Sequence, residues 1–245
     1  MNKGIYIATS EPNSGKSIVA LGLMRMLLAK TAKIGYFRPI IDNSSKDQKD
    51  NHINTILSHF KLDIDYEEAY AFTRSEFISK RNADKDGEIL DIIIEKYKVL
   101  EDRNDFMLVE GTDFSGEGTA IELDANVLIA QNLGIPTVIV SSGIGKNLDE
   151  FISGLHLAYD SFDEKGVKVF AVIANKVEKK NIDIIVDSVE KNLPQDTVVN
   201  AIPLIPGLKN PTLKEIAKAV DAKVLFGEEF LNNQSNSFKV GAMQL

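Results

Sequence analysis

The fold of this chain is decided by residues 5–17, which read IYIATSEPNSGKS. An apolar run from Ile5 to Ala8 enters a polar turn that ends in Gly-Lys-Ser, and a second apolar run, from Ile18 to Leu28, follows. This order of strand, loop and buried helix is the context that a phosphate-binding loop (P-loop) requires. The loop glycine lets the backbone approach a phosphate, and the loop N–H groups and the helix N-terminus then face the anion.

The loop supplies the candidate phosphate-binding residues. They are Asn13, Ser14, Gly15, Lys16 and Ser17. Lys16 is expected to reach the β/γ-phosphates, and the Ser17 hydroxyl is expected to ligate Mg²⁺. The pattern G-x-x-x-x-G-K-[ST] is not fully matched, because Ser10 stands where it has glycine. The alternative is a surface turn that contains Gly-Lys-Ser by chance, but the strand before it and the helix after it favour the phosphate site.

Composition limits the function. The chain has 245 residues, 44% of them hydrophobic, which is enough for one large α/β domain, and its net charge of −8 disfavours a nucleic-acid partner. It has no cysteine and therefore no disulfide framework or thiolate metal site. Its three histidines, His52, His59 and His156, form no metal-binding pattern and are expected to be ordinary helix residues. Without an apolar signal sequence or an apolar stretch of about 18 residues, we expect a cytoplasmic protein with no membrane partner.

Short apolar runs alternate with helical patterns along the chain. The runs are continuously apolar, as expected of strands that are buried on both faces. This pattern predicts an α/β fold of three layers, a doubly wound, mainly parallel sheet of about seven strands of the P-loop NTPase type. The second strand is expected to end at Pro39, and residues 66–80 read as short helices or a loop. The strands are expected at residues 5–8, 33–41, 106–109, 137–140, 167–174, 197–202 and 223–226.

Four marked positions follow predicted strands. They are the loop Thr9–Ser17, Arg38, Glu110 and Asn175. Ligands of such sheets bind beyond the carboxyl ends of the strands, so the fold is expected to gather these positions at one edge.

Each of these side chains has a functional and a structural interpretation. Glu110 is either a second Mg²⁺ ligand or the first residue of a solvated loop. Asn175 either reads an adenine with its amide or is a turn residue. Arg38 either clamps a carboxylate or phosphate or is a plain surface arginine, and Asp50 is either a ligand contact or a helix cap.

The C-terminal end differs in composition from the rest. Residues 232–237 read NNQSNS, a polar linker, and the run from Phe238 to Leu245 is apolar. We therefore expect a domain over 1–231, followed over 232–245 by a linker and the truncated start of a further domain.

Several runs resemble the dethiobiotin synthetases, which are P-loop, ATP-dependent cyclo-ligases. Those runs are Thr9–Ser17, Gly35–Pro39, Val109–Gly111 and Val172–Val177, in the same order, and the resemblance extends to about Phe226. It implies that Lys16 and Ser17 hold phosphate and Mg²⁺, that Glu110 holds the metal and that Asn175 contacts the adenine.

A closer resemblance is to the N-terminal domain of long bacterial phosphate acetyltransferases. It is carried by Ser10–Ser17, Tyr36–Ile40, Glu67–Thr73, Phe226–Glu229 and Phe238–Met243. It implies a hexameric parent enzyme that interconverts acetyl-CoA and phosphate with acetyl phosphate and CoA. It also implies that this part is regulatory or structural, with the acyltransferase site elsewhere.

This chain differs from the dethiobiotin synthetases at two places where those enzymes handle the small substrate. Arg38 stands where dethiobiotin synthetases carry lysine, and Thr112-Asp113-Phe114 stands where they are glycine-rich. We expect a retained site for ATP or another nucleotide with Mg²⁺, no catalytic residue, and a homo-oligomer.

Two alternatives remain open. One is a stand-alone, ATP- and Mg²⁺-dependent carboxylate or amine ligase of the dethiobiotin synthetase type, against which Arg38 counts. The other is a ParA/MinD-like ATPase. Such ATPases carry a lysine early in the P-loop, which positions 10–14 lack, and they need a membrane helix or a DNA-binding surface.

Overall fold

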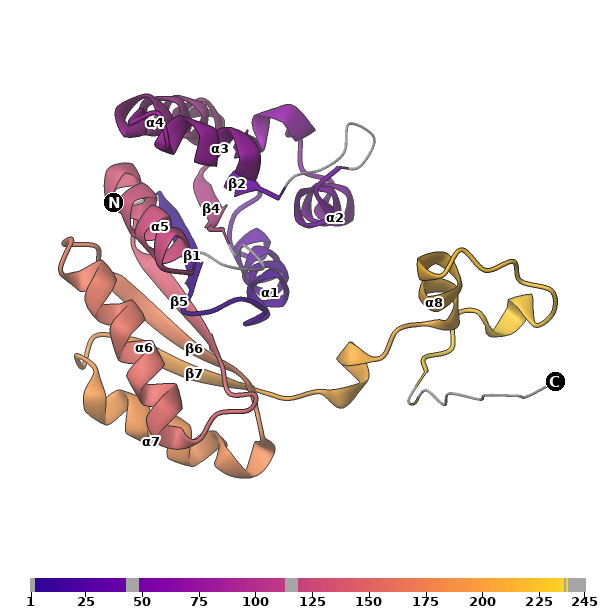
Figure 1. Ribbon diagram of the computed structural model, residues 1–245. Coiled ribbons are helices and arrows are strands. Elements are labelled where there is room, and N and C mark those ends of the chain that lie inside the picture. Colours follow the sequence, from indigo (N-terminus) through magenta and orange to yellow (C-terminus); the bar gives the residue numbers. More distant parts are fainter. Residues whose placement is uncertain (1–2, 43–48, 113–118, 236, 238–245) are drawn as a thin grey trace. The chain divides into compact units, whose positions relative to one another are not determined.

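A computed structural model describes residues 3–42, 49–112, 119–235 and 237, and it confirms the three-layer α/β fold. The described residues form one seven-stranded sheet in which every pairing is parallel, in the order β3-β2-β4-β1-β5-β6-β7 (Figure 1). The strands are β1 (Gly4–Thr9), β2 (Ile34–Ile41), β3 (Tyr70–Thr73), β4 (Phe106–Glu110), β5 (Thr137–Ser142), β6 (Val169–Val177) and β7 (Val198–Pro203). Because β1 lies in the middle of the sheet, the loop that follows it is at the centre of the carboxyl edge.

Helices cover both faces of this sheet. The helices are α1 (Lys16–Leu28), α2 (Asn51–Phe60), α3 (Arg74–Arg81), α4 (Asp86–Arg103), α5 (Thr119–Leu133), α6 (Leu148–Asp163), α7 (Ile182–Asn192) and α8 (Leu213–Ala219). Residues of β1 alternate between the two faces: Ile7 packs with α1 and α2, whereas Tyr6 and Ala8 pack with the cluster that includes α4, α5 and α6. This alternation explains why the strand is apolar along its whole length.

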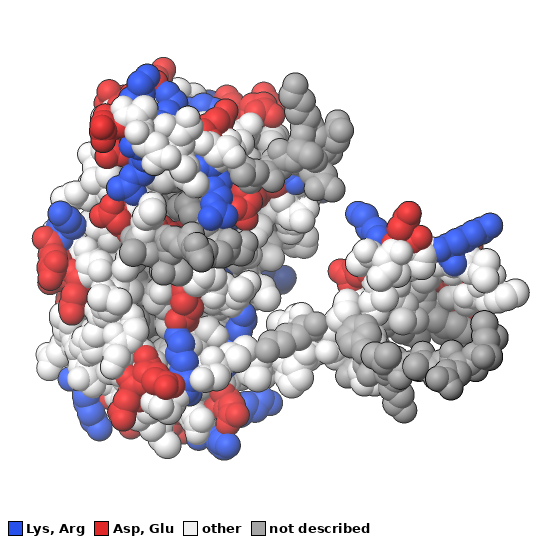
Figure 2. All heavy atoms as spheres, in the orientation of Figure 1, with Lys and Arg blue, Asp and Glu red and all other residues white. Residues whose placement is uncertain are grey.

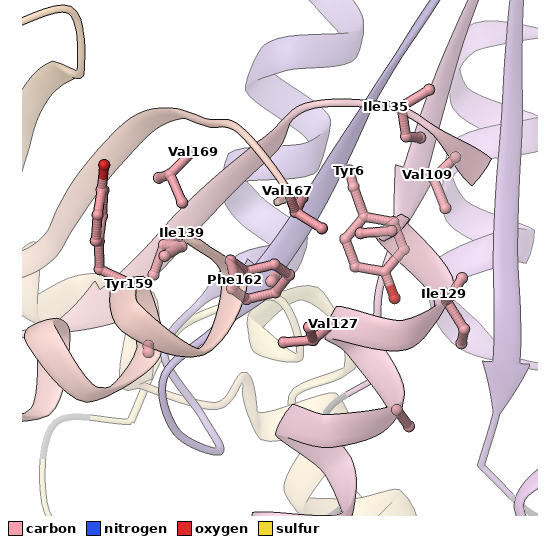
Figure 3. Packing of buried hydrophobic residues seen from close by; sticks show 14 of the residues in the cluster. Tyr6, Val109, Val127, Ile129, Ile135, Ile139, Tyr159, Phe162, Val167 and Val169 are labelled. Atoms are coloured by element: carbon pink, nitrogen blue, oxygen red, sulfur yellow. The ribbon is translucent and has the colours of Figure 1, made fainter. Parts of the chain in front are cut away.

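The larger core cluster lies between the sheet and helices α3 to α7, and it holds Tyr6 in place (Figure 3). Tyr6 is fully buried, with Val127 of α5 and Phe162 of α6 in the same cluster. Its hydroxyl donates to Asn126 Oδ1 at 2.7 Å, so the polar end of this buried ring is satisfied. Packing on this side therefore fixes the strand that leads into the P-loop.

The structure corrects two expectations on the β2 side. Residues 66–80 contain a 3₁₀ turn (Tyr66–Glu68) and the edge strand β3 as well as most of α3. Pro39 does not end β2, which continues to Ile41. Pairing with β4 stops at Phe37, and β2 then continues its ladder with β3 alone. A residue without an N–H is tolerated there because it lies beyond the last pair with β4.

The chain divides into two compact units, 1–203 and 204–245. In the second unit the Thr212 side chain caps α8 in a capping box with Glu215. The strand expected at 223–226 is wrong: these residues form no ladder, and Phe226 is 92% exposed. The two units divide at residue 203, before the domain boundary expected at 231, and that expected boundary stays a prediction. The expected start of a further domain, Phe238–Leu245, lies outside the described residues.

Candidate functional site

The backbone of the predicted P-loop has the conformation that an anion site needs. Gly15 is the N-cap of α1 with φ of 87°, in the left-handed region, and Asn13 also has a positive φ of 58°. A Cβ atom at position 15 would lie 2.4 Å from Asn175 Nδ2, so both the dihedral angle and the available space require glycine. The N-terminus of α1, with its positive end of the helix dipole, starts at the next residue.

Lys16 is the buried cation of this loop. Only 1% of it is exposed, and its Nζ donates to the carbonyl oxygen of Gly111, just after β4. An ammonium group is buried at this depth only when it has polar partners. A phosphate oxygen would be a stronger, charge-assisted acceptor than a carbonyl, so the side chain is well placed to exchange one for the other.

The end of β6 supports the loop from the other side. Asn175 Nδ2 donates to the carbonyl of Ser14 at 2.8 Å, its Oδ1 accepts from the Lys176 N–H at 2.9 Å, and Lys176 Nζ donates to the carbonyl of Asn13. Asn175 is therefore brought to the P-loop as predicted, and it positions the loop backbone. Its expected contact with adenine stays a prediction.

Some buried hydroxyl groups at the site lack a partner among the described residues. Ser14 Oγ in the loop and Thr112 Oγ1 after β4 have no hydrogen bond to any residue that the structure describes, and both residues are at most 1% exposed. Buried polar atoms are normally hydrogen-bonded, so orphaned ones mark places where a ligand or water belongs. Together with Lys16 and the loop amides, they fit an incoming phosphate group.

Glu110 lies at the end of β4 and is 1% exposed. Its Oε2 accepts from the Tyr36 hydroxyl at 2.7 Å, and its Oε1 lies 2.8 Å from His52 Nδ1. Burial raises the pKa of this carboxyl, but the His52 hydrogen bond and the charges of Arg38 and Lys16 outweigh burial and lower it to about 2. Glu110 is therefore a carboxylate at neutral pH, with protein partners on both oxygen atoms.

Ser17 and Glu110, the two predicted Mg²⁺ ligands, meet at the same side chain. Ser17 Oγ lies 2.9 Å from the same His52 Nδ1 that contacts Glu110. Magnesium prefers a set of oxygen ligands and water, and an imidazole nitrogen does not belong in such a set. With His52 in this position, the side chains do not fit a magnesium ion.

Arg38 and Asp50 form a buried ion pair. Arg38 Nη1 lies 3.2 Å from each Asp50 carboxylate oxygen, and Asp50 Oδ1 also accepts from the N–H groups of His52 and Ile53 at 3.0 Å. Asp50 is therefore the N-cap of α2, one of its two expected roles. Arg38 is 3% exposed, so its interpretation as a surface arginine is wrong, while ligand contact by either residue stays a prediction.

The sequence interpretation missed three residues of this site. The sequence predicts only an ordinary helix residue at His52, whereas its ring touches Ser17 and Glu110. It predicts only a strand residue at Tyr36, whose hydroxyl donates to Glu110. Asn126 accepts from the Thr112 N–H at 2.9 Å and donates to the Thr112 carbonyl at 3.1 Å, and an amide inside an apolar helical run was the available signal. Asp113 and Phe114, the other two residues that replace the glycine-rich stretch of the ligases, lie outside the described residues.

The sequence family described as AAA domain matches residues 3–212, so the chain belongs to that family, and it is a P-loop domain. It is 39% identical to a phosphate acetyltransferase of Nitratidesulfovibrio vulgaris over 249 residues, which is all of this chain and 35% of that protein. The chain thus spans about a third of that relative. It is 25% identical to an ATP-dependent dethiobiotin synthetase of Clostridium kluyveri, over 86% of this chain and 87% of the relative. Both expected resemblances are confirmed.

A solved structure agrees with the fold. A putative plasmid partition protein of Borrelia burgdorferi bound to AMPPNP superposes with a TM-score of 0.50, 11% identity and 94% coverage of both chains. On the face drawn in Figure 2, acidic and basic side chains are interspersed over the described residues. Among those residues, no helix combines the length and the apolar character needed to span a membrane.

Proposed function

We propose that this chain is the nucleotide-binding N-terminal domain of a phosphate acetyltransferase and that it acts as a regulatory or structural part of that enzyme. The observation that carries the proposal is the P-loop. Gly15 opens α1 in the left-handed region, buried Lys16 points its ammonium to the carboxyl edge, and Ser14 Oγ is buried without a partner among the described residues. These features support binding of a polyphosphate, and the relationship to phosphate acetyltransferases supports the choice of parent enzyme.

The proposed ligand is ATP or another nucleotide or phosphorylated metabolite. We do not include the expected Mg²⁺ in the proposed set, because His52 stands between Ser17 and Glu110. No acyl transfer is assigned to these residues, and the parent reaction would interconvert acetyl-CoA and phosphate with acetyl phosphate and CoA. The expected cytoplasmic location and homo-oligomeric, hexameric parent stay predictions, as does the expectation that neither nucleic acid nor membrane is a partner.

A ligase of the dethiobiotin synthetase type is a weaker proposal. Arg38, which stands at the position of the ligase lysine, is buried and paired with Asp50. A side chain held in this way is less available to handle a reactive carbamate than a lysine that faces the substrate.

Calorimetric titration of ATP into the wild type and Lys16→Ala tests the proposal. Loss of one lysine–phosphate contact is expected to weaken binding by about 1.5–3 kcal/mol, which is roughly tenfold or more. The exposed Lys30, just after α1, provides the control variant Lys30→Ala, which should bind like the wild type. Equal ATP affinity in wild type and Lys16→Ala would contradict the proposal.

A second experiment addresses regulation. A ligand that is bound and not converted acts only by favouring one conformation or assembly state, with a reciprocal coupling of about 1–3 kcal/mol. In the full-length enzyme, ATP should change the affinity for acetyl-CoA or the assembly equilibrium, and Lys16→Ala should abolish that change. Acetyl phosphate formation by the 245-residue chain alone would contradict the absence of a transfer site, and a full-length enzyme indifferent to ATP would contradict regulation.

A further inference from the structure

His52 occupies the space between the two oxygen ligands that a cation would use. A magnesium ion needs its oxygen ligands at about 2.0–2.1 Å. His52 Nδ1 is already within 2.9 Å of Ser17 Oγ and 2.8 Å of Glu110 Oε1. An ion bound to both oxygens would have to take the volume that this ring nitrogen fills.

Both carboxylate oxygens of Glu110 already have a protein partner. The Tyr36 hydroxyl donates to Oε2 at 2.7 Å, while Oε1 faces His52. Among the residues that the structure describes, no group of three or more His, Cys, Asp or Glu side chains could hold a metal ion. The carboxylate is thus part of a side-chain network that engages both of its oxygens.

The position of His52 is built into the fold. Asp50 caps α2 by accepting from the His52 N–H itself, and the buried Arg38 holds Asp50 from β2. Ile53, the next residue, and Ile56, about one turn further, anchor α2 in the core beside α1. The backbone of His52 is therefore fixed by buried contacts, and its ring is directed at the end of β4.

We infer that the His52 imidazole replaces the divalent cation in this P-loop, so that the site takes a polyphosphate that carries no metal ion. The ligand class rests on the proposed function, whereas exclusion of the cation rests on His52, Ser17 and Glu110 alone. Lys16, the loop N–H groups and the N-terminus of α1 supply the positive charge for the phosphates.

The first test needs no nucleotide. Mn²⁺, which gives an electron paramagnetic resonance signal when free, is titrated into the 245-residue wild type and into His52→Asp. The aspartate adds a carboxylate to the oxygens of Ser17 and Glu110, so this variant should gain one Mn²⁺ site that the wild type lacks. The site should disappear in the double variant His52→Asp/Glu110→Gln. His59→Asp, an exposed histidine on the same helix, is the control and should behave as wild type.

The second test compares ATP affinity in excess Mg²⁺ and in EDTA. The wild type should bind ATP with nearly the same affinity in both. His52→Ala, which opens the position without adding a charge, should bind at least about fivefold more tightly with Mg²⁺ than without it, since coupling between two ligands is typically that large. This variant also keeps the inference testable if His52→Asp does not fold, which circular dichroism would show.

Two results would overturn the inference. One is a Mn²⁺ site in the wild type that is lost in His52→Ala, because His52 would then be a metal ligand. The other is wild-type ATP binding that depends on Mg²⁺ as strongly as in His52→Ala. If ATP bound in neither condition, the proposed nucleotide function would fail, and the Mn²⁺ titration would still decide the role of His52.

Discussion

The two sides of the site are built differently. On the P-loop side, residues 13 and 14 are held through backbone atoms, since Asn175 and Lys176 donate to the carbonyls of Ser14 and Asn13. On the opposite side, formed by Arg38, Asp50 and His52, side chains bond to one another and to Glu110. The first arrangement leaves loop N–H groups for an anion, whereas the second ties its charged side chains to one another. The comparison teaches that the half proposed to bind phosphate is braced at its backbone, whereas the half around Glu110 is filled by contacts between side chains.

The largest expected effect comes from breaking the ion pair on the closed side. Asp50→Ala leaves the Arg38 guanidinium buried without its carboxylate and removes the cap of α2. Loss of one partner of a buried pair costs about 3–5 kcal/mol of unfolding free energy, measured by urea denaturation. Asp50→Asn keeps a capping oxygen and removes only the charge. A stability loss below about 1 kcal/mol in Asp50→Ala would show that this side is not held by the pair.

Glu110→Gln tests the contacts of Glu110 with the same side of the site, through the pH dependence of the unfolding free energy. The carboxyl has a pKa of about 2 in the folded protein against an ordinary 4.5, so its stabilisation is present above about pH 4.5 and is lost as pH falls to about 2. The contribution near neutral pH is on the order of 3 kcal/mol. The difference in unfolding free energy between wild type and Glu110→Gln should therefore shrink between pH 5 and pH 2.

A matched control for this pH dependence is Glu95→Gln, an exposed glutamate on α4. It should leave the pH dependence of unfolding unchanged. A difference between wild type and Glu110→Gln that stays constant down to pH 2 would show that the glutamine acts through packing and not through the lost charge.

The smallest effect is expected on the P-loop side. Asn175→Ala removes the hydrogen bond to the Ser14 carbonyl and the one from the Lys176 N–H, each worth about 0.5–1.5 kcal/mol. If Asn175 only positions the loop, affinity for ATP, GTP and inorganic triphosphate should fall by the same factor. A loss confined to ATP would instead show that the amide reads adenine.

Most of the sheet was predictable, because β1, β4, β5 and β6 are continuous apolar runs that only a buried strand explains. β3 was missed because it is a four-residue edge strand with little periodicity of its own. The strand expected at 223–226 failed because apolar residues there meet no partner strand, and Leu225 and Phe226 are mostly exposed.

Some residues of the candidate site were likewise predictable from the sequence, and others were not. Lys16, Glu110 and Asn175 were predictable because Lys16 starts α1 after the loop that follows β1, Glu110 ends β4 and Asn175 lies near the end of β6. The fold rule gathers such positions at one edge of the sheet. The contact of His52 depends on how α2 approaches the ends of β1 and β4. His52 of α2 meets Ser17 of α1 and Glu110 of β4, which are far apart in the sequence. The residues next to His52 therefore do not reveal this contact.

A crystal structure of the chain with ATP and Mg²⁺ tests the central claim most directly. The account predicts that the phosphates lie in the loop Ser10–Ser17 and that Lys16 Nζ has moved from the Gly111 carbonyl to a phosphate oxygen. It also predicts His52 still between Ser17 and Glu110, with no metal on Glu110. Phosphates bound elsewhere, or a magnesium ion held by Ser17 and Glu110 with His52 displaced, would contradict it.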